Sequence, residues 1–115
     1  MKKKFLPAFT GLFEAMKDTG VQIQIFLGFL AVLAGFILKI NPGEWLAVLI
    51  MIALVVSLEI INACLEKLCD LYTTEYNEKI RVIKDLSAGA VLWSACVALV
   101  IGGIIFLPKI WRWIK

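Results

Sequence analysis

Three long stretches of the chain are apolar and uncharged, and they set the pattern of the whole sequence. No charged residue occurs within residues 19–38, 45–58 or 86–107. About 20 apolar residues are enough to cross the hydrocarbon core of a bilayer. Together with the polar residues at their ends, these stretches predict three transmembrane helices, over residues 19–39, 44–72 and 79–108. The first two are separated by Asn41-Pro42-Gly43, a combination that breaks helices.

The first 18 residues have a different pattern, in which apolar residues recur at helical spacing. These apolar positions are Phe5, Phe9, Leu12, Phe13 and Met16. Polar residues lie between them, so residues 1–18 are expected to form an amphipathic helix on the membrane surface. The basic run Lys2-Lys3-Lys4 would hold this helix against the cytoplasmic headgroups. The alternative is that the segment forms the first turn of the first transmembrane helix.

The composition is that of a small integral membrane protein. The chain has 115 residues, 62% of them hydrophobic, which leaves room for three spans and no separate soluble domain. The predicted fold class is therefore all-α, and a bundle this small is expected to form an oligomer. The net charge of +3 is too mild to indicate nucleic-acid binding. The chain has no histidine, so any general base must be a carboxylate or a lysine.

The distribution of basic residues predicts the orientation in the membrane. Eight lysine or arginine residues lie before the first span and around the connection between the second and third, and four lie on the other side. Cytoplasmic segments carry an excess of basic residues. The N-terminus and the second connection are therefore expected in the cytoplasm.

A stripe of polar residues interrupts the second apolar helix near its end. At 100° per residue, Glu59, Glu66 and Asp70 fall within about 40° of one another, and Asn62 lies about 60° to one side. An ionisable group at membrane depth costs roughly 2.5–3.5 kcal/mol on insertion scales, so such residues usually mark a functional site.

Carboxylates at this position can accept a proton or hold Mg²⁺, and Lys84 could neutralise phosphate charge. These are the parts needed for phosphoryl transfer, although the sequence has no Walker A motif and no protein-kinase glycine loop. From the residues alone, a cation-conducting or lysis-type membrane protein fits nearly as well.

Three motifs resemble the signature of the prokaryotic diacylglycerol kinase and undecaprenol kinase family. They are E-I-I-N-A-C-L-E-K-L-C-D at residues 59–70, E-Y at 75–76 and K-D-L-S-A-G-A-V-L at 84–92. Their spacing agrees with the family pattern without a gap. The resemblance implies a homotrimer in the bacterial cell membrane, with active sites shared between protomers at the cytoplasmic interface. It also implies that ATP and Mg²⁺ phosphorylate the hydroxyl of diacylglycerol. Undecaprenol is the alternative substrate, and a non-catalytic membrane oligomer or pore with the same fold is the alternative function.

The resemblance also implies a role for each matching residue. Glu59 would be the general base, and Asn62 would position the lipid hydroxyl. Glu66 would hold Mg²⁺ and nucleotide phosphate, and Asp70 would support the polar cluster. The residues expected near ATP are Glu75, Tyr76, Asn77, Lys84 and Asp85.

One departure from the family pattern concerns a second metal-binding glutamate near the surface helix. An ungapped alignment puts Thr19 at that position, whereas deletion of one residue puts Asp18 there and Gln24 at a usual histidine. We expect Asp18 to be the metal ligand, because a shorter carboxylate can still bind Mg²⁺. The Thr19 alignment is the best support for the non-catalytic alternative.

Overall fold

The computed structural model describes the backbone of residues 2–115 and the side chains of residues 5–115, and this part of the chain is helical without strands. The helices are α1 (Lys2–Ala15), α2 (Thr19–Ile37), α3 (Pro42–Tyr72) and α4 (Glu78–Ile114). The last three are long and apolar enough to cross a membrane, which confirms the all-α fold with three candidate spans. The side chains of Lys2, Lys3 and Lys4, which we expected to anchor the surface helix, lie outside the described part.

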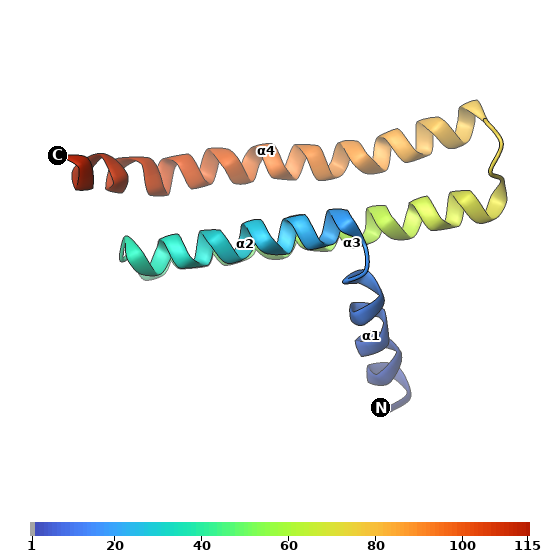
Figure 1. Cartoon of the computed structure of the whole chain (residues 1–115), viewed down its shortest axis with the longest axis horizontal. Helices are drawn as coiled ribbons and strands as arrows, with labels where there is room; N and C mark the ends of the chain where they lie inside the picture. The colour runs from blue at the N-terminus through green and yellow to red at the C-terminus, as the bar shows by residue number, and fades with distance from the viewer. Residues whose placement is uncertain (1) are drawn as a thin grey trace.

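Helix α3 is central to the arrangement (Figure 1). It packs against both α2 and α4, whereas α2 and α4 contact each other little. Helix α1 leaves the start of α2 and runs across the direction of the other three helices. At 1.5 Å per residue α3 is about 46 Å long and α2 only about 28 Å, so one end of α3 continues well past the start of α2.

Polar side chains at the residues before α2, α3 and α4 explain where these three helices begin. The Asp18 carboxylate accepts a hydrogen bond from Val21 N at 3.0 Å, which caps α2. Asn41 and Glu44 form a reciprocal capping box at the start of α3, with Pro42 at the first helical position. Asn77 caps α4. Because Asp18 starts a new helix, α1 ends at Ala15, before the boundary predicted at residue 18.

The connection between α2 and α3 is a tight turn, as the sequence predicted. Lys39 has φ 55°, a left-handed conformation that glycine usually occupies. Leu38 N donates to Ala34 O at 2.9 Å, and Ile40 N donates to Gly35 O at 3.1 Å, which satisfies the last carbonyls of α2. A side chain at Gly35 would meet the Trp45 ring at 2.7 Å, so this glycine allows α3 to approach α2 closely.

Helix α4 does not end at Pro108, where we placed the end of the third span. It continues to Ile114, with the N–H of Lys115 still bonded to Trp111 O at 3.1 Å. A proline removes only one hydrogen bond of its own, and such a loss is tolerated in membrane helices. The Lys109 ammonium also pairs with the Glu44 carboxylate at 2.8 Å, which ties this part of α4 to the start of α3.

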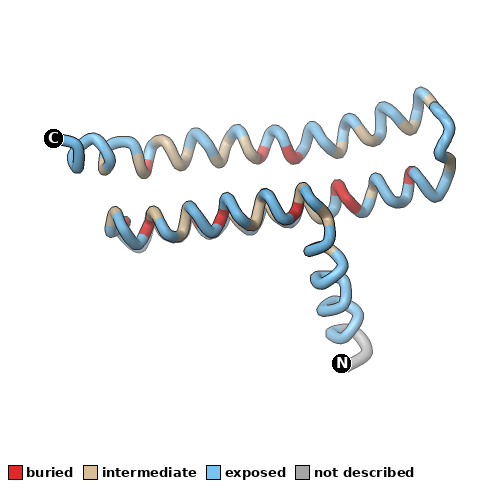
Figure 2. Tube along the Cα trace, in the orientation of Figure 1, coloured by how far each residue is buried: buried red, intermediate tan, exposed pale blue. Residues whose placement is uncertain are grey.

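Few side chains are buried within the single chain (Figure 2). The buried apolar residues line the contacts of α3 with its neighbours and include Val48, Met51, Val55, Val91 and Ile105. Most large apolar side chains are exposed, on α1 as well as on the three long helices. Exposed apolar surface on this scale is the mark of a chain surrounded by lipid or by other subunits.

Candidate active site

The polar stripe of α3 lies in the region where α3 and α4 extend past the start of α2. Along it, Glu59 is half-buried, Asn62 is buried, and Glu66 and Asp70 are exposed. The stripe therefore passes from the contact with α2 toward the loop that joins α3 to α4. All four predicted residues lie on this one helix.

Asn62 orients Glu66 and presents an unused acceptor. Its Nδ2 donates to Glu66 Oε1 at 3.1 Å across one helical turn. Its Oδ1 is buried and has no hydrogen-bond partner among the residues that the structure describes. A buried carbonyl oxygen without a partner costs about 1–3 kcal/mol, so a group that donates a hydrogen bond to this oxygen would be stabilised here. A hydroxyl is such a donor.

The Glu59 carboxylate lies against the first turn of α2. A Cβ atom built on Gly20 would be 2.9 Å from Glu59 Cδ and 3.1 Å from Asp18 Oδ2. The two acids therefore lie close to the same small volume. Asp18 and Glu66 were the predicted metal ligands, and within one chain the structure brings Asp18 near Glu59.

The carboxylates of the single chain would suit a magnesium ion with few protein ligands. Among the residues that the structure describes, no three His, Cys, Asp or Glu side chains gather closely enough to form a metal site. Mg²⁺ needs only one or two protein carboxylates when waters and substrate phosphates supply the remaining ligands. Glu66 meets this requirement, because one of its oxygens is fixed by Asn62 and its side chain is exposed.

Lys84 of α4 pairs with Asp70 of α3. The Lys84 Nζ and Asp70 Oδ1 atoms are 2.8 Å apart, and both side chains are partly exposed. This ion pair joins the two helices across the connecting loop and keeps the ammonium on the acid stripe. Asp70 thereby holds the Lys84 ammonium, and its predicted role in supporting the cluster stays a prediction.

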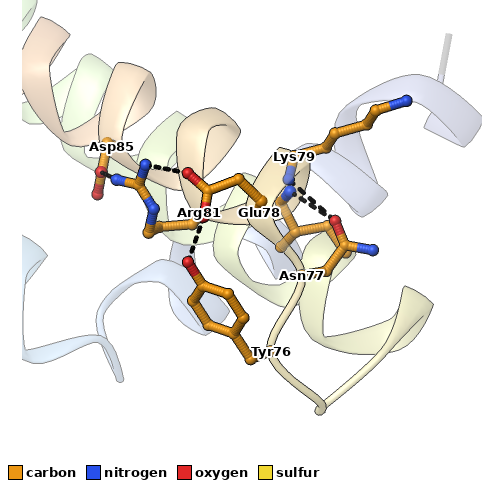
Figure 3. A network of polar contacts seen from close by, with 7 residues as sticks. Tyr76, Asn77, Glu78, Lys79, Arg81 and Asp85 are labelled. Atoms are coloured by element: carbon orange, nitrogen blue, oxygen red, sulfur yellow. Dashed lines mark hydrogen bonds and ion pairs between the residues drawn. The ribbon is translucent and has the colours of Figure 1, made fainter.

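A second polar network surrounds the start of α4 (Figure 3). Arg81 pairs with Glu78 on one side and with Asp85 Oδ2 at 2.8 Å on the other, and the Tyr76 hydroxyl donates to Glu78. The Arg81 guanidinium therefore lies between two carboxylates, those of Glu78 and Asp85. Asp85 and Tyr76 were predicted near the nucleotide. Arg81 and Glu78 were not predicted there. Arg81 follows Glu78 by three residues and precedes Asp85 by four, and these spacings on a helix indicate ion pairs.

The other two residues predicted near the nucleotide have backbone contacts. The Oδ1 atom of Asn77 accepts from Lys79 N at 3.0 Å and from Ile80 N at 3.2 Å. The N–H of Glu75 donates to Thr73 Oγ1 at 3.1 Å, which shapes the loop before α4. Asn77 therefore keeps a free Nδ2 that can donate, and Glu75 keeps an exposed carboxylate.

An apolar groove lies close to the contact between Glu59 and Gly20. It measures about 290 Å³ and runs between α1, α2 and α3. Its lining includes Phe9, Phe13, Val21 and Ile60 but not Glu59 itself; Val21 and Ile60 follow Gly20 and Glu59 directly in the chain. The groove therefore offers an apolar surface near a carboxylate, an arrangement that suits a lipid with a polar end.

Comparisons with known proteins agree on one family. The model of the family described as prokaryotic diacylglycerol kinase matches residues 7–106. An undecaprenol kinase of Bacillus subtilis is 31% identical over 109 residues, covering 94% of this chain and 89% of that protein. A diacylglycerol kinase of Synechocystis is 32% identical over 90 residues, covering 77% of this chain and 51% of that protein. No solved structure is detectably similar to the chain.

Proposed function

Because the chain belongs to the prokaryotic diacylglycerol kinase family of membrane lipid kinases, we propose that it transfers the γ-phosphoryl group of ATP to a lipid hydroxyl. The observation that carries this proposal is the position of the Glu59 carboxylate. It lies on Gly20 at the start of α2, one residue from Val21 and Ile60 of the apolar groove, and it begins the stripe that continues with Asn62 and Glu66. A lipid in the groove would have its hydroxyl at the start of the polar stripe.

In the proposed reaction the lipid hydroxyl oxygen bonds to the γ-phosphorus while the bond to the bridging oxygen breaks and ADP leaves. Glu59 accepts the hydroxyl proton as general base. Before transfer, the hydroxyl can donate its single hydrogen to the unpaired Oδ1 of Asn62, which orients it, and this hydrogen bond is exchanged for one to Glu59 when the proton is taken. Most of the remaining catalysis in phosphoryl transfer is positioning and charge stabilisation.

The nucleotide would lie over the start of α4. Lys84 and Arg81 supply positive charge there. The same turn is surrounded by polar groups of Glu75, Tyr76, Asn77 and Asp85. Glu66 would hold Mg²⁺, with Asp18 as a further ligand, and bound Mg²⁺ would neutralise charge on the phosphate oxygens. Asp70 holds Lys84 in place.

Two lipids are candidates for the substrate. The sequence analysis put diacylglycerol first, and the Synechocystis relative is a diacylglycerol kinase. The relative that matches along most of its own length is an undecaprenol kinase, and this observation favours undecaprenol. Both lipids combine an apolar tail with a hydroxyl, so the groove beside Glu59 accepts either by its chemistry.

Assembly and orientation are part of the same proposal. We infer a homotrimer in the bacterial membrane with the N-terminus in the cytoplasm and α1 on the membrane surface. The apolar surface left exposed by one chain supports assembly, as does an apolar groove of about 670 Å³ between α2, α3 and α4. The direction of α1 across the other helices supports its place on the surface.

The test is phosphorylation by the purified protein in lipid vesicles that contain ATP, Mg²⁺ and either diacylglycerol or undecaprenol. We expect transfer to undecaprenol to be the faster of the two. Glu59→Gln should lower kcat by about 10²–10⁴-fold, the usual contribution of a general base. Glu44→Gln makes the same change at the opposite end of α3. It should leave kcat within a factor of roughly two to three of wild type, which is the size of effect expected from a site far from the reaction. Transfer to neither lipid by a folded oligomer would refute the proposal.

A further inference from the structure

We propose that Gly20 is a positioning residue for Glu59, because the absence of a side chain at Gly20 determines where the Glu59 carboxylate lies. The inference rests on the proposed role of Glu59 as general base. A Cβ at position 20 would overlap Glu59 Oε1 and lie 2.9 Å from Glu59 Cδ. Distances under 3.0 Å are too short for a real Cβ, so the carboxylate occupies the space that any other residue would fill.

Backbone conformation does not explain this glycine. Among the described residues no glycine has a positive φ, so Gly20 is not needed for a left-handed turn. It lies in the first turn of α2, where glycine is less favourable than alanine by roughly 0.5–1 kcal/mol in a helix interior and by less near an end. The reason for glycine is therefore space, which the Glu59 carboxylate uses most closely, while Asp18 Oδ2 lies 3.1 Å from the same point and would need to shift only slightly.

If a methyl group were added at Gly20, the Glu59 side chain would move more readily than α2. The next residue, Val21, is completely buried, and its N–H is held by the Asp18 carboxylate at 3.0 Å. These contacts fix the first turn of α2. The Glu59 carboxylate, in contrast, is the far end of a flexible side chain that is only half-buried. We therefore expect Gly20→Ala to displace the carboxylate at little cost in stability.

A displaced base should affect chemistry more than nucleotide binding. A shift of about 1 Å in a reacting group can lower a rate by about 10²-fold. We expect Gly20→Ala to lower kcat by about 10–100-fold and to leave KM for ATP unchanged, since the residues expected near ATP lie at the start of α4. The melting temperature should stay at or slightly above that of wild type.

The chain provides a matched control at the start of α3. Gly43 is two residues after the cap Asn41, as Gly20 is two residues after the cap Asp18. A Cβ at Gly43 would meet only Asn41 Oδ1, at an ordinary 3.4 Å. Gly43→Ala thus makes the same change at the same helical position without touching Glu59, and should leave kcat unchanged.

A double-mutant cycle with Glu59→Asp separates positioning from packing. The shorter acid withdraws its carboxylate from Gly20, so Gly20→Ala should cost at most about 3-fold in kcat in the Glu59→Asp background, against 10–100-fold with the native glutamate, because residues in contact couple. An equal loss in both backgrounds, no loss at all, or a melting temperature lowered by Gly20→Ala and not by Gly43→Ala would overturn the inference. Wild-type activity in Glu59→Gln would instead refute Glu59 as the base, so the two failures are distinguishable.

Discussion

Replacing Asn62 by leucine should make the protein more stable and much less active. Asn62 is only 8% exposed, and its Oδ1 has no partner in the described part of the chain. Its Nδ2 donates to Glu66 Oε1 at 3.1 Å. Leucine has a similar size and no polar atoms, so the substitution removes both the unpaired oxygen and the hydrogen bond.

The two effects on stability have opposite signs. Removing an unsatisfied buried oxygen stabilises the folded state by about 1–3 kcal/mol. Losing the bond to Glu66 costs about 0.5–1.5 kcal/mol, because this carboxylate is exposed and can bond to water instead. The net expectation is a gain of about 1 kcal/mol in the free energy of unfolding. Turnover should fall by about 10²-fold, since the lipid hydroxyl loses an acceptor and Glu66 loses its orientation.

Unfolding of the purified protein in detergent micelles, followed by circular dichroism, measures the first effect, and lipid phosphorylation measures the second. Ser94→Ala is the matched control, because Ser94 is equally buried but its hydroxyl is satisfied by Val91 O at 2.8 Å. That control should lose about 1 kcal/mol. If Asn62→Leu loses stability as Ser94→Ala does, Oδ1 has a partner in the assembled protein and is not the free acceptor that the mechanism uses.

Three further predictions concern the turn and the start of α4. Lys39→Gly should raise the free energy of unfolding by up to about 1 kcal/mol. Glycine relieves the left-handed conformation at φ 55°, and this gain is partly offset by the greater freedom of the unfolded chain. A lower free energy of unfolding in micelles would contradict this prediction. Lys84→Met should raise KM for ATP about 10-fold, and Asp70→Asn should raise it less. Both melting temperatures should stay near that of wild type, because the ion pair is partly exposed. If both variants instead lower the melting temperature equally and leave KM unchanged, the ion pair contributes to stability alone. Arg81→Lys should also raise KM for ATP, since one ammonium cannot contact Glu78 and Asp85 together as the guanidinium does; unchanged kinetics would exclude Arg81 from the nucleotide site.

Local signals in the sequence were enough to predict the helices and to place the polar stripe on one of them. The apolar stretches gave the three long helices, and the turn at Asn41-Pro42-Gly43 lies where α2 gives way to α3. The stripe on α3 depends only on helical periodicity, so Glu59, Asn62 and Glu66 could be placed on one face before any packing was known. Motif spacing identified the family.

The contacts between helices could not be predicted in this way. Nothing local indicates that Lys84 pairs with Asp70 or that the Glu59 carboxylate lies on Gly20, because both depend on how α3 packs against its neighbours. The end of the last helix, which we placed at Pro108, also depends on a contact between helices. A proline usually ends a helix, but in α4 the following turn is held by the ion pair between Lys109 and Glu44, which is 65 residues away in the sequence.

Two residues that we predicted as functional also cap helices, and the caps constrain what they can do in catalysis. Asp18 uses one carboxylate oxygen to cap α2, which leaves the other for a metal ion. Asn77 uses Oδ1 for two backbone N–H groups, so only its Nδ2 remains, and this atom donates hydrogen bonds. A donor at the positive N-terminal end of α4 suits phosphate oxygens. Aspartate at position 77 would cap α4 equally well but would bring a second negative charge to the phosphates. Asn77→Asp should therefore preserve stability while weakening ATP binding, which separates the two roles of one side chain.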